Sequence, residues 1–228
     1  MDLQGVDVGA AYRGVRERIL DLVADLSAEQ WETVTPHCPA WTIRQTISHL
    51  AGIVDDGINN NMDGVATEAW TAAHVDKRSL LSGPDIATEW ATWAPFVDAR
   101  ATERGLDMSQ LVFDAVTHEH DLRHALGMPG ARDSVAVSVG VWFATRKIPQ
   151  RLAAKGIGLQ LVVDGVSLLN DTRADLQPLS FHGSAFDVLR MSGSRRTAPQ
   201  IYSLNWDGDP APFIAELPFA LPVEPISE

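Results

Sequence analysis

Three of the seven histidines lie close together in the segment DAVTHEHDLRHALG, among carboxylates that could share a ligand with them. If this segment is a helix, each residue advances by about 100° around the axis. His118 then lies about 40° from Asp114, and Asp121 lies about 20° from Asp114 on the other side. His120 falls roughly opposite, and His124 lies at the margin. Asp114, His118 and Asp121 would therefore share a stripe with apolar neighbours, which are Leu111, Leu122 and Ala125.

A divalent metal is the chemistry that this stripe favours. Burying two carboxylates and a histidine side by side is costly unless a cation compensates them. Asp114 and His118 are four residues apart and can point at one spot. His49, within SHLAG, is the best third ligand from another helix. Three protein ligands leave a position open for water, which is the arrangement of a catalytic zinc site.

Other interpretations of the same residues remain open. His49 alone could be a core histidine bonded to a carbonyl, and Asp114–His118 could be a pair on a helix surface. His120 and His124 are also four residues apart and form a rival pair. Asp56 is either solvated or an outer partner of a ligand.

The elements that must position these residues are helical in the first half of the chain. Helical spacing predicts helices over about residues 6–26, 43–59, 84–103 and 108–126, with Pro95 inside the third. Ser27 with Gln30 predicts a short capped turn, Thr42 caps the second long helix, and Asp107 caps the fourth. TPHCPAW is expected to be a loop, and no strand is expected before residue 120. The pattern is typical of an up-down bundle with one long connection.

The pattern changes in the second half. A further helix is expected over residues 134–145, and after Gly156 the segment GLQLVVDG indicates a strand ending in a turn. SAFDVLRMSG indicates a short helix, and QIYSLNWDG indicates another strand. The fold class is therefore α+β, with a helical bundle over residues 1–130 and a linking helix plus small α/β domain over residues 131–228.

Composition excludes several classes of protein. Hydrophobic residues make up 45% of the 228 residues, which is enough for a folded core. The net charge of −12 repels nucleic acid and anionic membranes, so neither is expected as a partner. Apolar runs are too short for a membrane span, and no signal peptide is evident. The single cysteine, Cys38, fits a reducing cytoplasm.

The segments PHCPAWTIRQTISHLAG and FDAVTHEHDLRHALG together resemble the mycothiol-dependent maleylpyruvate isomerase-like family, an actinobacterial branch of the DinB-like metal-binding bundles. SAFDVLRMSGSRR and the later WDGD resemble the C-terminal domain of that family. The resemblance implies a metal held by one histidine on the second helix and a carboxylate–histidine pair on the fourth. These positions are His49, Asp114 and His118. The namesake isomerase has glutamate where this chain has Asp114.

The chemistry that the resemblance implies is activation of a low-molecular-weight thiol, mycothiol, by the metal, because a metal stabilises thiolate over thiol. The thiol would then react with a small electrophile in an isomerase or S-transferase reaction. Cys38 is expected to pack rather than to react. Asp121 is a candidate catalytic base, and Trp41 could form a wall of the pocket. Arginines suited to a carboxylate substrate or cosubstrate are Arg190, Arg195 and Arg196.

Two alternatives to the enzyme are a non-catalytic metal- or ligand-binding protein of the same fold and an interaction protein whose metal is structural. Fold resemblance cannot supply the electrophile. A cytoplasmic monomer or homodimer, with a small-molecule thiol and an electrophilic substrate as its partners, is the expected form of the enzyme.

Overall fold

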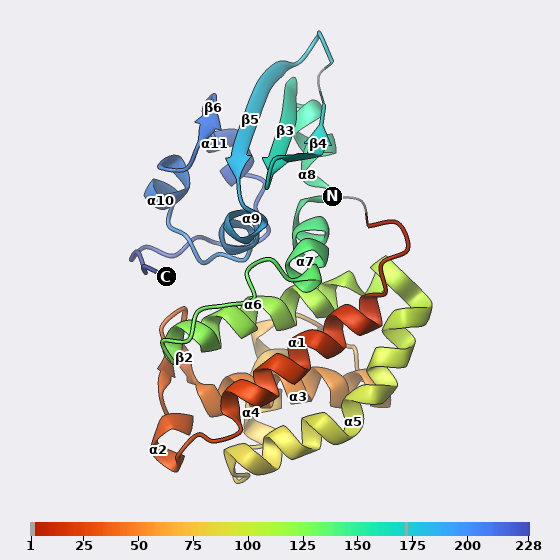
Figure 1. Ribbon diagram of the computed structural model, residues 1–228, viewed down its shortest axis with the longest axis vertical. Helices are drawn as coiled ribbons and strands as arrows, with labels where there is room; N and C mark the ends of the chain where they lie inside the picture. The colour runs from red at the N-terminus through yellow and green to blue at the C-terminus, as the bar shows by residue number, and fades with distance from the viewer. Residues whose placement is uncertain (1–2, 172) are drawn as a thin grey trace. The chain divides into compact units, whose positions relative to one another are not determined.

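The computed structural model describes residues 3–171 and 173–228 and has the expected α+β fold class (Figure 1). Asp7–Gly130 forms one compact unit, and Ala131–Glu228 belongs to a second. Among the described residues, no helix combines the length and the apolar character needed to cross a membrane.

Four long helices form the first unit: α1 (Val8–Val23), α3 (Ile43–Asn59), α5 (Gly83–Arg104) and α6 (Ser109–Ala125). α1 packs against α5 and α6, and α3 packs against the same two helices. Figure 1 shows the four side by side, from red α1 to green α6. Thr42 caps α3 in a capping box with Gln45, and Pro95 lies inside α5, both as predicted.

The expectation that no strand precedes residue 120 is wrong. After the short helix α2 (Ala28–Trp31), capped by Ser27 as predicted, β1 (Val34–Thr35) pairs with β2 (Cys38–Thr42) in a small antiparallel hairpin. Strand pairing satisfies backbone groups that a bare loop would leave to water. The hairpin holds Cys38 and Trp41 directly before α3.

The segment between α3 and α5, predicted as a connection, contains helix α4 (Glu68–Lys77). His74 is its buried residue, so α4 has no apolar stripe from which a helix could be inferred. Packing against α3 stabilises such a helix. The predicted cap Asp107 is also wrong, because it lies inside the 3₁₀ turn η1 (Gly105–Met108) that precedes α6.

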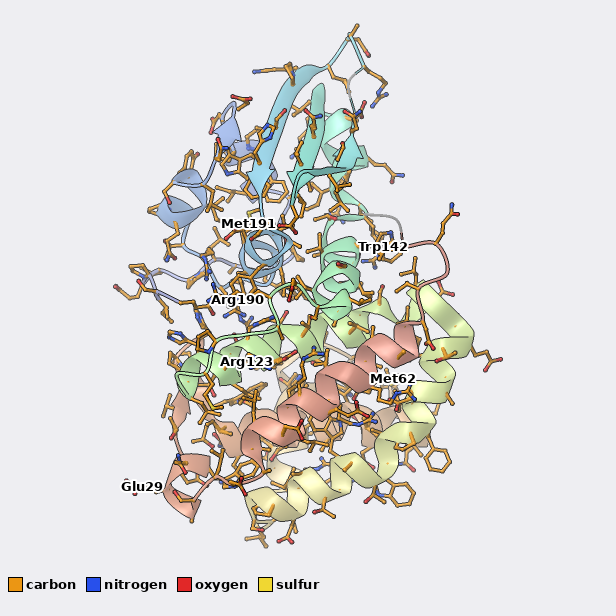
Figure 2. All side chains as sticks on the ribbon, in the orientation of Figure 1. Glu29, Met62, Arg123, Trp142, Arg190 and Met191 are labelled. Atoms are coloured by element: carbon orange, nitrogen blue, oxygen red, sulfur yellow. The ribbon has the colours of Figure 1, made fainter. Side chains whose placement is uncertain are left out.

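Helix α6 is buried over most of its circumference, and this corrects the single-stripe interpretation of its sequence. His120, expected on a less apolar side, is 4% exposed, and Val116 beside it is fully buried. Glu119 is also fully buried, and its carboxylate binds Arg18 of α1 and Arg123 of α6 (labelled in Figure 2). Burial alone therefore does not distinguish the candidate ligand His118 from His120.

The second unit is built around a four-stranded sheet in the order β4–β3–β5–β6. β3 (Ile157–Val163) pairs parallel with β5 (Gln177–Gly183) and antiparallel with β4 (Val166–Asn170). Asp164 and Gly165 both have positive φ in the turn that follows β3, as the DG signal indicates. Helices α7 (Val135–Thr145) and α8 (Ile148–Ala153) precede β3 in the chain. Helix α9 (Ala185–Ser192) follows β5, and Ser184 is its N-cap.

The strand predicted over QIYSLNWDG is mostly wrong. Its first part is helix α10 (Ala198–Tyr202), and only β6 (Trp206–Asp207) is a strand, followed by α11 (Ala211–Ile214). Thr197 and Gln200 form a capping box, and Pro199 suits the first helical turn. These local signals favour a helix and outweigh the apolar pattern of the segment.

We expect Gly83→Ala to destabilise the first unit by about 1–3 kcal/mol, because overpacking displaces well-packed side chains. A Cβ at Gly83 would lie 2.1 Å from the ring of Trp31, which is buried. Urea unfolding measures the loss. The matched control is Gly57→Ala in α3, where a Cβ meets nothing within 4 Å. This control should stabilise the helix by up to about 1 kcal/mol, and equal effects of the two changes would contradict the assignment.

Candidate metal centre

Helices α3 and α6 bring together the three residues predicted as metal ligands. One donor atom each from His49, Asp114 and His118 lies within 4.8 Å of the other two. Nε2 of His49 is 3.3 Å from Oδ2 of Asp114, and Nε2 of His118 is 3.9 Å from Oδ1 of Asp114. Two imidazoles and a carboxylate are a donor set that suits zinc.

The cluster is buried on its histidine side and open on its carboxylate side. The side chains of His49 and His118 are 4% and 8% exposed, whereas that of Asp114 is 32% exposed. A cation held here would be shielded by the two rings and by the buried Oδ2 of Asp114, while the rest of the Asp114 side chain is partly exposed. This arrangement fits an open site better than a closed structural one.

Behind His118 lies a second carboxylate. Nδ1 of His118 is 3.1 Å from Oδ2 of Asp121, which is fully buried, and the thiol of Cys38 donates to the same oxygen at 3.7 Å. Burial lowers the pKa of His118, but Asp121, Cys38 and the charge of Asp114 outweigh it and raise that pKa to about 10. The surroundings of His118 therefore favour positive charge, which either a proton or a metal ion can supply.

Behind His49 lies a second histidine. Nδ1 of His49 is 3.2 Å from Nδ1 of His74, and Nε2 of His74 is 2.8 Å from Oδ2 of Asp56. Burial lowers the pKa of His74, against the opposing effect of Asp56. Asp56 is thus buried and hydrogen-bonded. Of the two interpretations of this residue, the structure favours an outer partner of a candidate ligand over a solvated carboxylate.

Two tryptophans flank the histidines. The ring of Trp41, in β2, lies 5.1 Å from that of His49 and 5.9 Å from that of His118, between centroids. Trp70, in α4, lies 6.3 Å from His49 and 4.2 Å from His74. Trp41 is half-buried, which suits the predicted wall of a pocket.

A rival cluster shares one residue with the first. Ligand atoms of Cys38, His118 and Asp121 also lie within 4.8 Å of one another. This cluster uses Nδ1 of His118, whereas Nε2 faces Asp114. His120 belongs to neither group within the described part of the first unit.

The predicted arginines belong to the second unit. Arg190, in α9 and labelled in Figure 2, is fully buried, and its Nε donates to Oε2 of Glu228 at 3.0 Å. Arg196 donates to the same oxygen at 3.0 Å. Arg195 is half-buried and donates to the carbonyl of Gly193 at 2.6 Å. Two of the three arginines thus bind the carboxylate of Glu228, and binding of a substrate carboxylate by any of the three stays a prediction.

Sequence reasoning did not find His74 or Trp70. Both lie on α4, in the segment that was predicted as a connection. The signal that could have found them is Thr67, the N-cap of α4, whose hydroxyl accepts from the amide of Trp70. His74 follows four residues after Trp70 on the same helix.

The model of the mycothiol maleylpyruvate isomerase N-terminal domain matches residues 12–146. A crystal structure of an alanine mutant of the mycothiol-dependent maleylpyruvate isomerase is similar at a TM-score of 0.56 and 12% identity, covering 88% of this chain and 94% of that one. A second structure of that isomerase gives a TM-score of 0.50 and 13% identity, covering 87% and 91%.

At these identities the solved structures establish the shared fold alone, and no curated protein sequence matches the chain. The family model, in contrast, spans more than half of the chain and includes all three candidate ligands. The chain therefore belongs to the family defined by the mycothiol maleylpyruvate isomerase N-terminal domain.

Proposed function

We propose that this protein is a metal-dependent enzyme that activates mycothiol for isomerase or S-transferase chemistry on a small electrophile. The observation that supports it is the convergence of His49, Asp114 and His118 at one partly open point of a bundle from this family. We propose these three as the ligands of one zinc ion per chain, in a cytoplasmic enzyme supplied by a reducing thiol pool.

A bound zinc ion would stabilise the thiolate form of the cosubstrate near neutral pH. The protein contributes two neutral imidazoles and one carboxylate, so its ligand set offsets one of the two positive charges of a divalent ion. The remaining charge suits a thiolate. The ring of Trp41 lies beside both histidine rings and would cover that side of a bound ion.

Asp121 is better suited to positioning than to contact with substrate. It was predicted as a catalytic base, yet its side chain is fully buried and faces His118 and Cys38. We propose that it orients the His118 ring. Because Cys38 donates to Asp121, its thiol is engaged behind the ligand, which leaves the role of nucleophile to an external thiol.

The proposed carboxylate-binding groups are three arginines of the second unit. Arg190 binds the Glu228 carboxylate through two nitrogens, in the fork geometry that suits an acidic substrate or cosubstrate, and Arg196 adds one hydrogen bond to the same carboxylate. Arg195 remains a proposed substrate-binding residue. Replacing it should raise KM more than it lowers kcat if the contact is equal in ground and transition states.

Turnover of an electrophile panel should require both added mycothiol and metal. A free thiol with a pKa of about 8.5 is only a few per cent ionised at pH 7, so full ionisation raises thiolate about 30-fold. Metal removal should therefore lower the rate at least about 30-fold at that pH. Chelation followed by zinc restoration, with steady-state rates, measures this. Asp114→Ala should lose metal and rate together, and Asp114→Glu should retain both.

Cys38→Ser is the control. If Cys38 were the nucleophile, this variant would be inactive, whereas a variant that uses an external thiol should keep most of its activity. Hydrolysis of a panel electrophile without added thiol would contradict the proposal and identify the protein as a hydrolase. Stoichiometric metal without turnover on the whole panel would favour the non-catalytic binding protein of the same fold.

A further inference from the structure

A row of hydrogen-bonded side chains extends from His49 away from Asp114. Nδ1 of His49 lies 3.2 Å from Nδ1 of His74, and Nε2 of His74 lies 2.8 Å from Oδ2 of Asp56. The amide of Asn61 donates to the other oxygen of Asp56 at 3.0 Å. All three inner members are at most 8% exposed. Nδ1 of His49, both ring nitrogens of His74 and both carboxylate oxygens of Asp56 therefore each have a partner inside the protein.

The row constrains where protons can lie. A hydrogen bond between two ring nitrogens contains one proton, so the acceptor nitrogen must be bare. The ionised Asp56 carboxylate only accepts, so Nε2 of His74 carries a proton. If His74 is neutral, its Nδ1 is bare and accepts from His49. The proton of His49 is then on Nδ1, and its Nε2 lone pair faces Asp114.

The opposite arrangement does not suit a cation. If His74 donated through Nδ1 it would be an imidazolium, and a neutral His49 would carry its proton on Nε2. That proton would point at Asp114, 3.3 Å away, and no lone pair would face the cluster. The row is therefore complementary to one tautomer of His49, and this is the tautomer that binds metal through Nε2.

We propose that His74 and Asp56 are positioning residues that hold His49 in its Nδ1–H tautomer and orient its Nε2 toward a divalent cation. The inference rests on the proposed metal-dependent function for its purpose, although the tautomer can be observed without metal. Histidine ligands commonly donate their second N–H to a carboxylate or carbonyl, which fixes the ring and raises ligand basicity. Here the carboxylate acts through an intervening histidine.

The His74 ring packs directly against residue 52 of α3, where only glycine leaves enough space for it. A Cβ on Gly52 of α3 would lie 2.2 Å from Cγ of His74 and 2.5 Å from two other ring or side-chain carbons. Trp70, one turn earlier on α4, packs edge-on against the same ring. Because the ring is packed between Gly52 of α3 and Trp70 of α4, its orientation is restricted, and its hydrogen bonds therefore have a fixed direction.

The C-terminal end of α4 is held independently of the row. Arg78, which is 1% exposed, donates to the carbonyl of His74 at 3.3 Å. Its guanidinium also binds Glu89 of α5 and Asp55 of α3. These contacts position the His74 backbone, and they remain when the His74 side chain or Asp56 is replaced.

The test has two readouts. Long-range ¹H–¹⁵N spectra of the metal-free chain, recorded at about pH 8, above the ordinary pKa of a histidine side chain, identify which ring nitrogens of His49 and His74 carry a proton. Zinc affinity is measured by competition with a chromophoric chelator. We expect Nδ1–H for His49 in the native chain. His74→Leu should remove this preference and weaken zinc binding roughly 10- to 100-fold. Asp56→Asn should have a smaller effect, because its amide oxygen can still accept.

Asp55→Asn is the matched control. It removes the same charge from the adjacent residue of α3 and weakens contacts with Lys77 and Arg78, but Arg78 keeps its bonds to Glu89 and to the His74 carbonyl, and the row itself is untouched. It should change neither readout. An Nε2–H signal for His49 in a native chain that binds zinc would overturn this inference alone, as would an unchanged tautomer in His74→Leu. An Nδ1–H signal in a chain that binds no zinc would overturn the metal proposal and leave the tautomer assignment standing.

Discussion

Replacing His49 with alanine is expected to weaken zinc binding by more than about 100-fold, since loss of an outer partner alone costs about 10- to 100-fold. His49 supplies the α3 contribution to the cluster, 3.3 Å from Asp114. Without it, Asp114 and His118 remain on one helix and provide only two ligands. The loss is measured by chelator competition and by metal content after gel filtration, with circular dichroism to verify folding.

His120→Ala is the matched control for this experiment. His120 is a buried histidine on α6, two residues from His118, and it belongs to neither candidate cluster in the described first unit. Like His49→Ala, the variant removes one buried histidine side chain, but it removes it from α6 and should keep the metal. If His120→Ala loses zinc while His49→Ala or His118→Ala retains it, the ligand assignment is wrong.

Asp98→Ala is expected to lower the free energy of unfolding by about 3–5 kcal/mol, because it leaves a buried guanidinium without its carboxylate. Arg16 of α1 binds Asp98 of α5 through two hydrogen bonds of 2.6 and 2.9 Å. Their side chains are 7% and 8% exposed. Burial lowers the pKa of Arg16, but Asp98 outweighs it and the pKa is raised overall. Urea unfolding of the whole chain measures the change.

Glu32→Ala is the control for the second prediction. Glu32 binds Arg44 at 2.6 Å, but its side chain is 52% exposed, so its removal should change stability by less than about 1 kcal/mol. Similar losses for the two variants would show that burial does not determine the strength of these pairs. Joint replacement of Arg16 and Asp98 by apolar residues should recover much of the loss, since no buried charge then remains.

The sequence determined the elements whose signals are local. Thr42 with Gln45, and Ser27 with Gln30, form capping boxes because the residues that satisfy the first amides of a helix lie within three positions of the cap. The α+β fold class and the four long helices follow from such signals and from apolar periodicity. The strand prediction for QIYSLNWDG was wrong because the capping box of Thr197 and Gln200 competes with the apolar pattern, and the cap prediction for Asp107 was wrong because that residue lies within a 3₁₀ turn.

The candidate site was predictable as a set of residue types. Asp114 and His118 are four apart on one helix, so the helical repeat alone places them together. His49 came from a weaker argument about helix faces and from the family resemblance. The structure places its Nε2 beside Asp114, and the assignment of all three as metal ligands stays a prediction.

Only the tertiary structure determined what lies behind the ligands. His74 reaches His49 from a short helix that has no apolar stripe, and Gly52 admits it through contacts 22 residues away in sequence. Cys38 meets Asp121 across 83 residues, through a hairpin that local propensity does not predict. Helical and capping signals act over a few residues, whereas these contacts depend on how α3, α4 and α6 pack. For this reason the sequence predicted the residue types of the candidate site, and packing determined which side chains lie next to them.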